Sequence, residues 1–516
     1  MPKEGTNRLW LAGICGLAVL LRGWHATSQN LWIDEVLTAR IVATPAAELL
    51  HPTAATPIQP TAWLSPLFFA VLKAAVSVSP ASDDTTLRWY AVLAGTAGVL
   101  AIAAATAALL GRPAGIVAGL LAALSPFDIW YSQEVRPYAL LLLTTTVAIA
   151  ALHRGLDGGG RSAWWTFVVA TALAWYTHPI AVVVPAVAVA DGVVERVWRR
   201  AERRWWLMTA LAAIGLAAVP ALAGMAVKGA NAIADPRGAG PLDLLYAVYS
   251  FAVGFSLGPS TTALHVQGMA AVRTAWPLVV LVALLFGGVS AVGVVTTGGR
   301  VRTRLLVWLL VPLVVPFAMA RLSGNPLNVR YVIVAFPAFV ALVATGTTTL
   351  WSRARPLAAG AVVLGMALYV GSIWNLHHDE RYAKEDCRAA GRLLDAEAAP
   401  DDVIVVNASY MQDAVAYYFH GTAPVVGVPR NDVLVDADEL RRQLDAAIGD
   451  HRRVWLVRSR TFHSDRAGLL PGMLAERRRA AGDWTFPGVH VERYVLPGAT
   501  ANAGREDPVR LPLPPG

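Results

Sequence analysis

The chain has 516 residues, of which 56% are hydrophobic and only 15% are charged, whereas soluble globular proteins carry about 25% charged residues. This composition excludes an ordinary soluble protein and indicates one that crosses a membrane several times, and two cysteines exclude a disulfide framework or a thiolate metal site. The net charge of +8 does not indicate nucleic-acid binding, because membrane proteins concentrate lysine and arginine in their cytoplasmic loops.

Twelve apolar segments follow one another along the first three quarters of the chain. They lie near 9–24, 62–79, 88–110, 113–131, 137–152, 162–176, 179–193, 205–227, 274–297, 304–320, 330–351 and 355–375. The first begins after basic residues, as a signal peptide would, but no convincing cleavage site follows it. We therefore expect it to stay in place as the first membrane span.

Five short basic clusters between these segments decide the expected topology. They are "GR" at 111–112, "HRGLDGGGR" at 153–161, "ERVWRRAERRWW" at 195–206, "GGRVRTR" at 298–304 and "SRAR" at 352–355. The positive-inside rule places all five in the cytoplasm if 62–79 does not cross and instead lies in or re-enters the outer leaflet. We therefore expect eleven spans, with 162–193 forming two short helices broken near Pro179, a residue that suits a helix start.

The character of the sequence changes after Leu376. Strand-like apolar runs then alternate with charged helical stretches, which predicts a small α/β domain. The expected strands lie in 401–408, 423–429, 452–459 and 489–496, and an expected helix lies in 437–449. Eleven crossings from a cytoplasmic N-terminus place this domain outside the cytoplasm. We thus expect a membrane domain at 1–376, an extracytoplasmic domain at 377–500 and a disordered Pro/Gly-rich tail at 501–516.

Asp34 and Glu35 form a pair of adjacent carboxylates shortly after the first span. One interpretation is structural, because the helix dipole favours carboxylates in a first helical turn, and the following residues read as an amphipathic interfacial helix. The other interpretation is catalytic, because a carboxylate beside a membrane-borne substrate can act as a general base. Asp34 is the preferred candidate for that base, and Glu35 also suits a helix cap.

The stretch "SPFDIWYSQEVRPYALLLL" at 125–143 joins two expected spans. It places Tyr131, Gln133, Glu134 and Arg136 close together in the sequence. Ionisable groups at membrane depth tend to mark function. The alternative is a polar turn with an aromatic belt.

Three further polar residues stand at ends of expected spans. His178 lies at the break before Pro179, and Arg330 and Tyr331 open a later span. Each has a structural alternative, because a histidine can simply occupy a helix break and an interfacial arginine can extend to the membrane surface.

The eleven-span topology brings these weak signals to one face. Asp34, Glu134, His178 and Arg330 all fall on the non-cytoplasmic side. Carboxylates there can act as a general base or as metal ligands, and Arg136, Arg330 and His178 can bind a phosphate. A lipid-linked sugar phosphate fits this set of groups, with a base deprotonating the acceptor hydroxyl and cations stabilising the leaving phosphate.

The motifs resemble those of a known superfamily. "LWIDEVLTA" resembles the acidic first-loop motif of the C-type (GT-C) glycosyltransferases, and "ALSPFDIWYSQEVRPYALLLL" is similar to the second-loop pattern of bacterial family 39-like members. These members are related to protein O-mannosyltransferases and lipid A aminoarabinose transferases. "WYTHPIAVVV", "NVRYVIVAFP" and the entry to the outer domain follow in the order typical of that group, so the resemblance covers nearly the whole chain.

The resemblance implies a polyprenyl-phosphate-sugar donor, an inverting mechanism and juxtamembrane helices in the first outer loop. It matches Asp34 to the proposed base, Glu35 to its neighbour, and Glu134 and Arg136 to a motif near donor and acceptor. The acceptor would be a protein, a glycolipid or a polysaccharide, and the site would face outward from the plasma membrane.

The sequence departs from the group at one position in the first outer loop. Relatives have a His or Glu before a double proline, whereas "WLSPLFFAVL" has Leu64 and Ser65 there. A metal ligand expected at this point is missing, which places a bound divalent metal in doubt.

Two other functional classes remain open from the sequence. A secondary transporter or flippase for lipid-linked sugars would also have intramembrane charges and broken helices, although no repeated half is visible. The other class is an inactive homologue whose outer domain binds envelope components. The presence of both acidic motifs argues against it.

Overall fold

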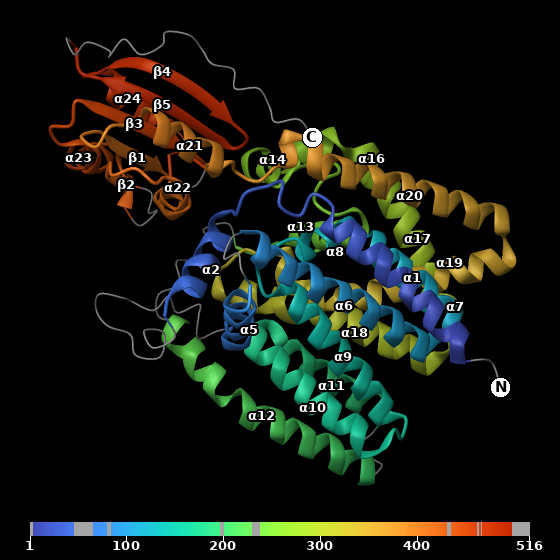
Figure 1. Ribbon diagram of the computed structural model, residues 1–516. Helices are drawn as coiled ribbons and strands as arrows, with labels where there is room; N and C mark the ends of the chain where they lie inside the picture. The colour runs from blue at the N-terminus through green and yellow to red at the C-terminus, as the bar shows by residue number, and fades with distance from the viewer. Residues whose placement is uncertain are drawn as a thin grey trace. The chain divides into compact units, whose positions relative to one another are not determined.

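Helices make up most of the chain up to residue 382, and a five-stranded sheet lies near its C-terminus (Figure 1). The computed structural model describes residues 4–45, 65–79, 84–196, 201–229, 238–430, 435–461, 464–465 and 467–497. The chain divides into one unit of Met1–Gln29 with Leu37–Tyr382 and a second unit of Asn30–Val36 with Ala383–Gly516. The expected disordered tail at 501–516 lies outside the described residues.

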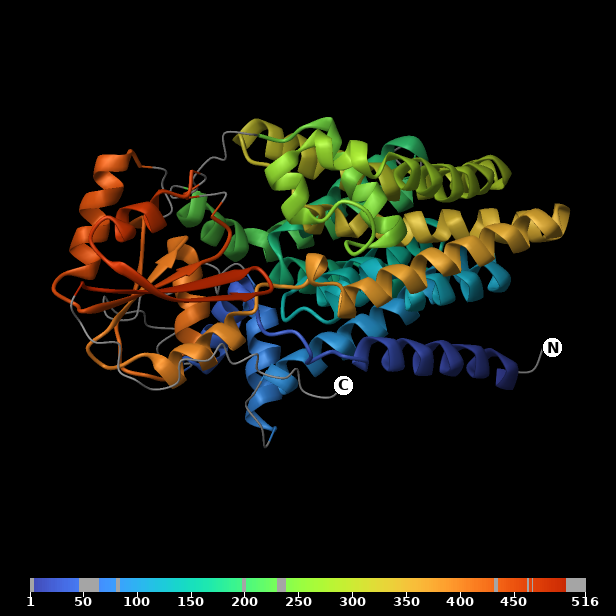
Figure 2. The same ribbon diagram turned by 90° about the horizontal axis from the view of Figure 1, so that it is seen from above.

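Most of the long helices of the first unit run side by side (Figure 1 and Figure 2). The bounds of its described helices, with α2 shared between the two units, are α1 Glu4–Gly23, α2 Ile33–Ala43, α5 Pro66–Ser77, α6 Asp84–Leu110, α7 Arg112–Leu124, α8 Pro126–Ser132, α9 Tyr138–Leu156, α10 Gly160–Thr177, η1 Pro179–Val182, α11 Val183–Val194, α12 Ala201–Gly229, α13 Pro241–Val253, α14 Thr261–Gln267, α15 Met269–Thr274, α16 Trp276–Val282, η3 Ala283–Gly287, α17 Gly288–Thr296, α18 Gly299–Ser323, η4 Val329–Ala335, α19 Phe336–Arg353, α20 Arg355–His378 and η5 Glu380–Tyr382.

Membrane-length helices are present, which confirms a polytopic helical protein. Among the described residues, six helices are long and apolar enough to cross a membrane, or seven if α7 and α8 count as one bent span. The six are Asp84–Leu110, Tyr138–Leu156, Trp276–Thr296, Gly299–Ser323, Val329–Arg353 and Arg355–His378. The expected count of eleven spans is thus not confirmed.

Two local expectations about helix length and breaks agree with the structure. Helix α5 has 12 residues, or about 18 Å at 1.5 Å per residue, which is too short to cross a hydrocarbon core of about 30 Å. Helix α10 ends at Thr177, and Pro179 opens the following turn η1. Proline is suited to this position because its missing N–H would have no helical partner there.

The apolar run 113–131 is bent rather than straight, which differs from the single span expected. Helices α7 and α8 meet at 61° around Ser125. Ser125 is extended (φ −64°, ψ 120°), as the residue before a proline prefers, and its Oγ accepts a hydrogen bond from the Asp128 N–H at 3.4 Å. Pro126 therefore starts a new helix inside a continuous apolar sequence.

An ion-pair network joins three helix ends at one end of the first unit. Arg304 of α18 pairs with Asp157 at 2.8 Å and with Glu195, and Arg300 pairs with Glu195 at 3.3 Å. These residues come from three of the basic clusters, at 153–161, 195–206 and 298–304. The structure therefore brings these clusters to the same end of the bundle, as the charge pattern predicts.

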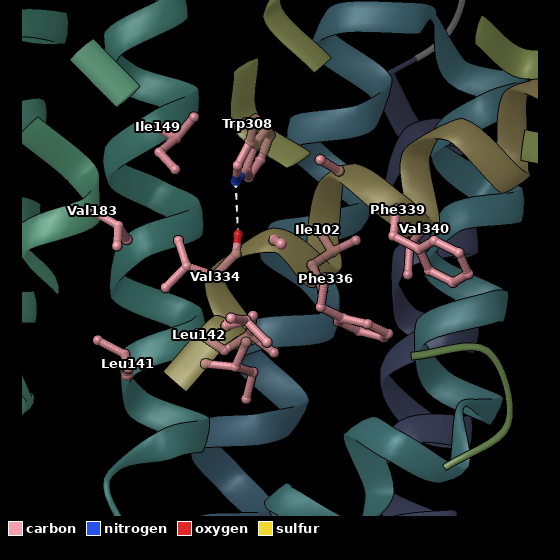
Figure 3. Close-up of a cluster of buried hydrophobic side chains, with 14 of the residues drawn as sticks. Ile102, Leu141, Leu142, Ile149, Val183, Trp308, Val334, Phe336, Phe339 and Val340 are labelled. Carbon is pink, nitrogen blue, oxygen red and sulfur yellow. Dashed lines mark hydrogen bonds between the residues drawn. The ribbon is translucent and has the colours of Figure 1, made fainter. Parts of the chain in front are cut away.

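The core of the first unit is a large cluster of buried apolar side chains. Side chains from α6, α9, α11, α18, η4 and α19 meet there, and the indole of Trp308 donates to the Val334 carbonyl at 3.0 Å (Figure 3). Close helix contact also depends on glycine. A Cβ on Gly293 of α17 would lie 2.1 Å from the Leu342 carbonyl oxygen, so only glycine lets α17 and α19 approach this closely.

The second unit is an α/β domain. Its sheet has the order β2-β1-β3-β5-β4, with β1 parallel to β2 and β3, and β5 antiparallel to β3 and β4. The strands are β1 Val403–Asn407, β2 Val425–Gly427, β3 Arg453–Arg458, β4 Arg479–Phe486 and β5 Val489–Val495. The helices are α21 Cys387–Glu397, α22 Gln412–Tyr418, α23 Ala437–Ile448 and α24 Leu469–Ala475, with a short turn η6 at Ser409–Met411.

The predicted strands of this domain are confirmed, and one strand was missed. The four expected apolar runs became β1, β2, β3 and β5, and 437–448 is helical. The hydropathy pattern did not predict strand β4, because it is an edge strand whose side chains are mostly exposed or half-buried. Its arginine, glycine and aspartate residues also lack the apolar alternation that marks a strand.

Candidate active site

Helix α2 begins with the acidic pair, and its two carboxylates have different surroundings. Glu35 is fully buried, and its Oε2 accepts hydrogen bonds from the Trp32 N–H at 3.2 Å and from Lys384 Nζ at 2.9 Å. Trp32 is the residue before the first helical position, so Glu35 supplies the carboxylate half of a capping box. Asp34 is half-buried at the second helical position.

The same helix contacts the second-loop motif one turn further on. Nη1 of Arg136 donates to Oγ1 of Thr38 at 3.1 Å, and both residues belong to the first unit. Asp34 and Thr38 are four residues apart in α2, so they share one face of this helix. Thr38 is buried and was not singled out from the sequence.

A fully buried arginine holds the start of the second-loop motif. Arg22 of α1 pairs with Asp128 at 3.0 Å and donates to the carbonyls of Ala122 and Ala123 at 3.0 and 3.1 Å. Those carbonyls lie in the last turn of α7, where Ala122 also accepts from the Ser125 N–H at 3.3 Å. Arg22 therefore joins α1 to both sides of the α7–α8 bend.

Gln133 also contacts α1 rather than the neighbouring polar groups. Its Nε2 donates to the backbone carbonyls of Arg22 at 3.0 Å and Trp24 at 2.8 Å. These contacts hold the C-terminal end of α1. The structure therefore gives Gln133 a structural contact, and a role in binding donor or acceptor stays a prediction.

Four residues of the first unit form what we call the arginine–tyrosine cluster: Tyr138, His178, Arg330 and Tyr331. The Arg330 guanidinium lies 5.8 Å from the Tyr138 ring centre and 5.5 Å from that of Tyr331. The His178 ring lies 5.6 Å from Tyr138 and 6.1 Å from Tyr331, measured between ring centres. Three chain segments that are distant in sequence thus meet at this point.

His178 is oriented within the cluster by the backbone. Its Nδ1 accepts a hydrogen bond from the Ile180 N–H at 3.1 Å. Because Nδ1 is the acceptor, the proton of neutral His178 lies on Nε2, which is then a donor. A phosphate oxygen is a suitable acceptor for such a donor.

Tyr131 links the second-loop motif to this cluster. Its ring lies 5.4 Å from that of Tyr138, and it is within electrostatic range of both Glu134 and Arg330. Glu134 is itself buried, 3% exposed. The structure therefore gathers Tyr131, Glu134 and the arginine–tyrosine cluster at one end of α9.

The cluster and the ion-pair network lie at opposite ends of the membrane-length helix α9. Tyr138 is its first residue, and Asp157 directly follows its last. Its 19 residues span about 28 Å, close to the thickness of a bilayer core.

Tyr138 and Lys384 were likewise not proposed from the sequence. Tyr138 stood inside the "YSQEVRPYAL" motif, and its place at the start of a predicted span was the available signal. Lys384 gave no signal, because its partner Glu35 is 349 residues away.

Possible metal ligands were also compared with the structure. Leu64 lies outside the described residues, and Ser65 is the residue before α5. Among the described residues, one group of three potential ligands lies close together: Asp483, His490 and Glu492. Both nitrogens of His490 are already used, since Arg458 contacts Nδ1 at 2.5 Å and Nε2 contacts Asp483 at 2.6 Å. This donor set therefore fits a hydrogen-bond chain better than a cation site.

Comparisons with known proteins agree with the architecture. Residues 60–223 match a family model described as dolichyl-phosphate-mannose-protein mannosyltransferase. No curated protein matched the sequence. ArnT from Cupriavidus metallidurans in the apo state is similar in structure, with a TM-score of 0.57 at 13% identity, covering 95% of this chain and 98% of ArnT.

Two further solved structures share the architecture. The oligosaccharyltransferase AglB from Archaeoglobus fulgidus, in complex with an inhibitory peptide and a dolichol-phosphate, has a TM-score of 0.55 at 11% identity, covering 94% of this chain and 74% of AglB. The arabinofuranosyltransferase AftD from Mycobacteria has a TM-score of 0.50 at 18% identity, covering 95% of this chain and 41% of AftD.

The chain has the GT-C fold. The similarity to ArnT extends over almost the full length of both chains, so it includes the membrane helices and the C-terminal domain. The GT-C resemblance of the sequence motifs is thereby confirmed as a fold. The residues assigned to its site stay predictions.

Proposed function

We propose that this GT-C protein transfers a sugar, with inversion, from a polyprenyl-phosphate-linked donor to an acceptor hydroxyl at the outer face of the plasma membrane. The observation that carries the proposal is the arginine–tyrosine cluster, with buried Glu134 nearby, at one end of an apolar helix bundle. A cation and a neutral imidazole donor there suit a lipid-borne phosphate. ArnT has been solved with undecaprenyl phosphate and AglB with a dolichol-phosphate, which supports this ligand class.

Arg330 and His178 hold the donor phosphate in this proposal. The guanidinium of Arg330 binds two phosphate oxygens through parallel N–H groups, and Nε2–H of His178 binds a third. Tyr331 and Tyr131 line the sugar and phosphate positions, and Glu134 and Arg136 lie near the donor and the acceptor.

Asp34 acts as the general base. Its carboxylate takes the proton of the acceptor hydroxyl while that oxygen bonds to the anomeric carbon from the face opposite the phosphate. The bond between the anomeric carbon and the phosphate oxygen breaks, and polyprenyl phosphate leaves with its negative charge held by Arg330. General-base help contributes roughly 10²–10⁴ in rate, and electrostatic stabilisation of the leaving group adds to it.

The proposal also concerns the identity of the sugar and of the acceptor. The name of the matching family model suggests mannose as the sugar. The acceptor is a protein, a glycolipid or a polysaccharide of the cell envelope. Lipid mass spectrometry of a strain lacking the gene identifies the donor, because the unused polyprenyl-phosphate sugar accumulates.

The Asp34→Asn variant tests the assignment of the base. With the identified donor and the purified protein in lipid nanodiscs, we expect transfer to fall by roughly 10²–10⁴-fold while donor affinity stays within about a factor of two. Asparagine keeps the size of the side chain but cannot accept a proton. Near-wild-type transfer by this variant would remove Asp34 from the mechanism, and translocation of the donor without transfer in the wild type would favour a flippase.

A further inference from the structure

The acidic first turn of α2 belongs to the same unit as the C-terminal domain. Residues Asn30–Val36 group with Ala383–Gly516, although more than 340 residues separate the two segments in the sequence. We infer that the C-terminal domain is a clamp that sets the position of Asp34, with Lys384, Tyr418 and Arg460 as positioning residues. This inference rests on the proposed function for the role of Asp34.

Two hydrogen bonds hold the residues just before the helix. The Leu31 N–H donates to the hydroxyl of Tyr418 at 2.8 Å, and Nδ2 of Asn30 donates to the Glu385 carbonyl at 2.7 Å. Leu31 is fully buried and Asn30 is 4% exposed. The domain therefore binds this segment through main-chain as well as side-chain groups.

Arg460 holds the next residue, Trp32. Its guanidinium lies 5.4 Å from the Trp32 ring centre and pairs with Glu385 at 2.5 Å. Burial opposes the charge of Arg460, but the neighbouring Glu385 carboxylate raises its pKa above the ordinary value. Arg460 therefore stays a cation against the indole, which is a favourable arrangement.

The backbone of Arg460 is also unusual. Its φ of +51° lies in the left-handed region, which costs a non-glycine residue roughly 1–2 kcal/mol. Arg460 follows the carboxyl end of β3, the edge where open α/β sheets commonly bind ligands. At this edge the domain holds a segment of its own chain, and the strained residue supplies one of the contacts.

Lys384 completes the clamp on the other side of Asp34. Its ammonium pairs with the fully buried Glu35 carboxylate at 2.9 Å and is itself only 10% exposed. Glu35 also accepts from the Trp32 N–H, so Lys384 neutralises the carboxylate that caps the helix. Asp34 thus lies between two residues, Trp32 and Glu35, that the C-terminal domain holds by their side chains.

The physical consequence concerns the geometry of the base. A displacement of about 1 Å in a catalytic group can lower a rate by 10²-fold without affecting substrate binding at a separate site. Loosening the clamp should therefore lower kcat and leave the KM for the donor unchanged, since the arginine–tyrosine cluster belongs to the other unit.

Four variants of the full-length protein in lipid nanodiscs test the clamp. Lys384→Met removes the charge opposite Glu35, and Tyr418→Phe is a milder change that removes one hydroxyl. Lys384→Arg should keep the ion pair with Glu35. The control is Arg453→Met, which breaks a 2.8 Å ion pair with Asp402 at the opposite end of β3. Hydrogen exchange of the peptide covering residues 30–37 and the kinetics of transfer are measured for each.

We expect exchange at 30–37 to quicken and kcat to fall by roughly 10–100-fold in Lys384→Met, less in Tyr418→Phe, with the donor KM within about twofold. Lys384→Arg and Arg453→Met should resemble the wild type in both measurements. Unchanged exchange in Lys384→Met and Tyr418→Phe would overturn the clamp. Faster exchange with unchanged kcat would overturn its role in positioning Asp34. The proposed function is tested separately, because it fails if the wild-type protein transfers no sugar. The hydrogen-exchange comparison between wild type and variants would still test the clamp in that case.

Discussion

Asp34 and Glu35 are neighbours in sequence but differ in what surrounds them. Glu35 is buried and engaged by a main-chain N–H and an ammonium group, whereas Asp34 is half-buried. A carboxylate already held by two donors is a poor proton acceptor, because those donors stabilise its charged form. The structure therefore assigns Glu35 to the helix cap, and the role of Asp34 as the base stays a prediction.

Arg330 provides a residue-scale prediction about donor binding. We expect Arg330→Gln to raise the donor KM by roughly 10–100-fold, since a hydrogen bond to a charged group contributes about 1.5–3 kcal/mol. Arg330→Lys should recover only part of the affinity, because an ammonium cannot form the paired contact of a guanidinium. The measurement is the donor dependence of the initial transfer rate.

Arg321→Gln is the matched control for Arg330. Arg321 is an exposed arginine in the last turn of α18, and it donates to the Ala239 carbonyl at 3.2 Å. A similar rise in KM for Arg321→Gln would indicate a general effect of positive charge at this end of the bundle. It would remove the specific role proposed for Arg330.

At the scale of elements, the α7–α8 bend shows how an apolar run conceals a helix break. Hydropathy over 113–131 predicts one span, but the Ser125-Pro126 pair starts a second helix at 61°. The start of the second helix can be predicted from the sequence, since serine followed by proline is a typical helix start. The direction of the new helix cannot be predicted from the local sequence, because Arg22 of another helix determines which groups α8 contacts.

The Arg22–Asp128 pair gives a prediction about stability. We expect Arg22→Met to lower the free energy of unfolding by about 3–5 kcal/mol, because the Asp128 carboxylate would stay buried without its cation. The double variant Arg22→Met with Asp128→Leu should lose less, since no buried charge is left over. Unfolding by SDS titration in mixed micelles, followed by circular dichroism, measures both.

The outcome of that comparison separates two roles of Arg22. A double variant as unstable as Arg22→Met would mean that the bonds to the α7 carbonyls, rather than the ion pair, hold the bend. An Arg22→Met protein as stable as the wild type would contradict both roles.

At the scale of the whole molecule, the two ends of the bundle are chemically different. One end carries the ion-pair network of Asp157, Glu195, Arg300 and Arg304, and the other carries the arginine–tyrosine cluster. The positive-inside rule favours the basic end in the cytoplasm and so predicts that the cluster lies outside.

Single cysteines at the two ends test this orientation. In a protein with Cys15 and Cys387 replaced by alanine, we expect Ser323→Cys to react with a membrane-impermeant maleimide in intact cells. Ser162→Cys should react only after permeabilisation. Both serines are exposed, and they stand at the end of α18 and the start of α10. The reverse pattern would contradict an outward-facing site, and reaction of both in intact cells would contradict their placement at opposite ends.

The sequence by itself determined the features that local physical chemistry controls. Apolar runs indicated the membrane class and most helix positions, Pro179 marked the helix break, and short apolar runs marked four of the five strands in the described residues. The tertiary structure decided which distant groups meet. It assigned Lys384 to Glu35, Arg22 to Asp128 and Arg330 to Tyr138. Such pairings depend on how helices and the domain pack, and a buried charge accepts whichever partner that packing brings within reach.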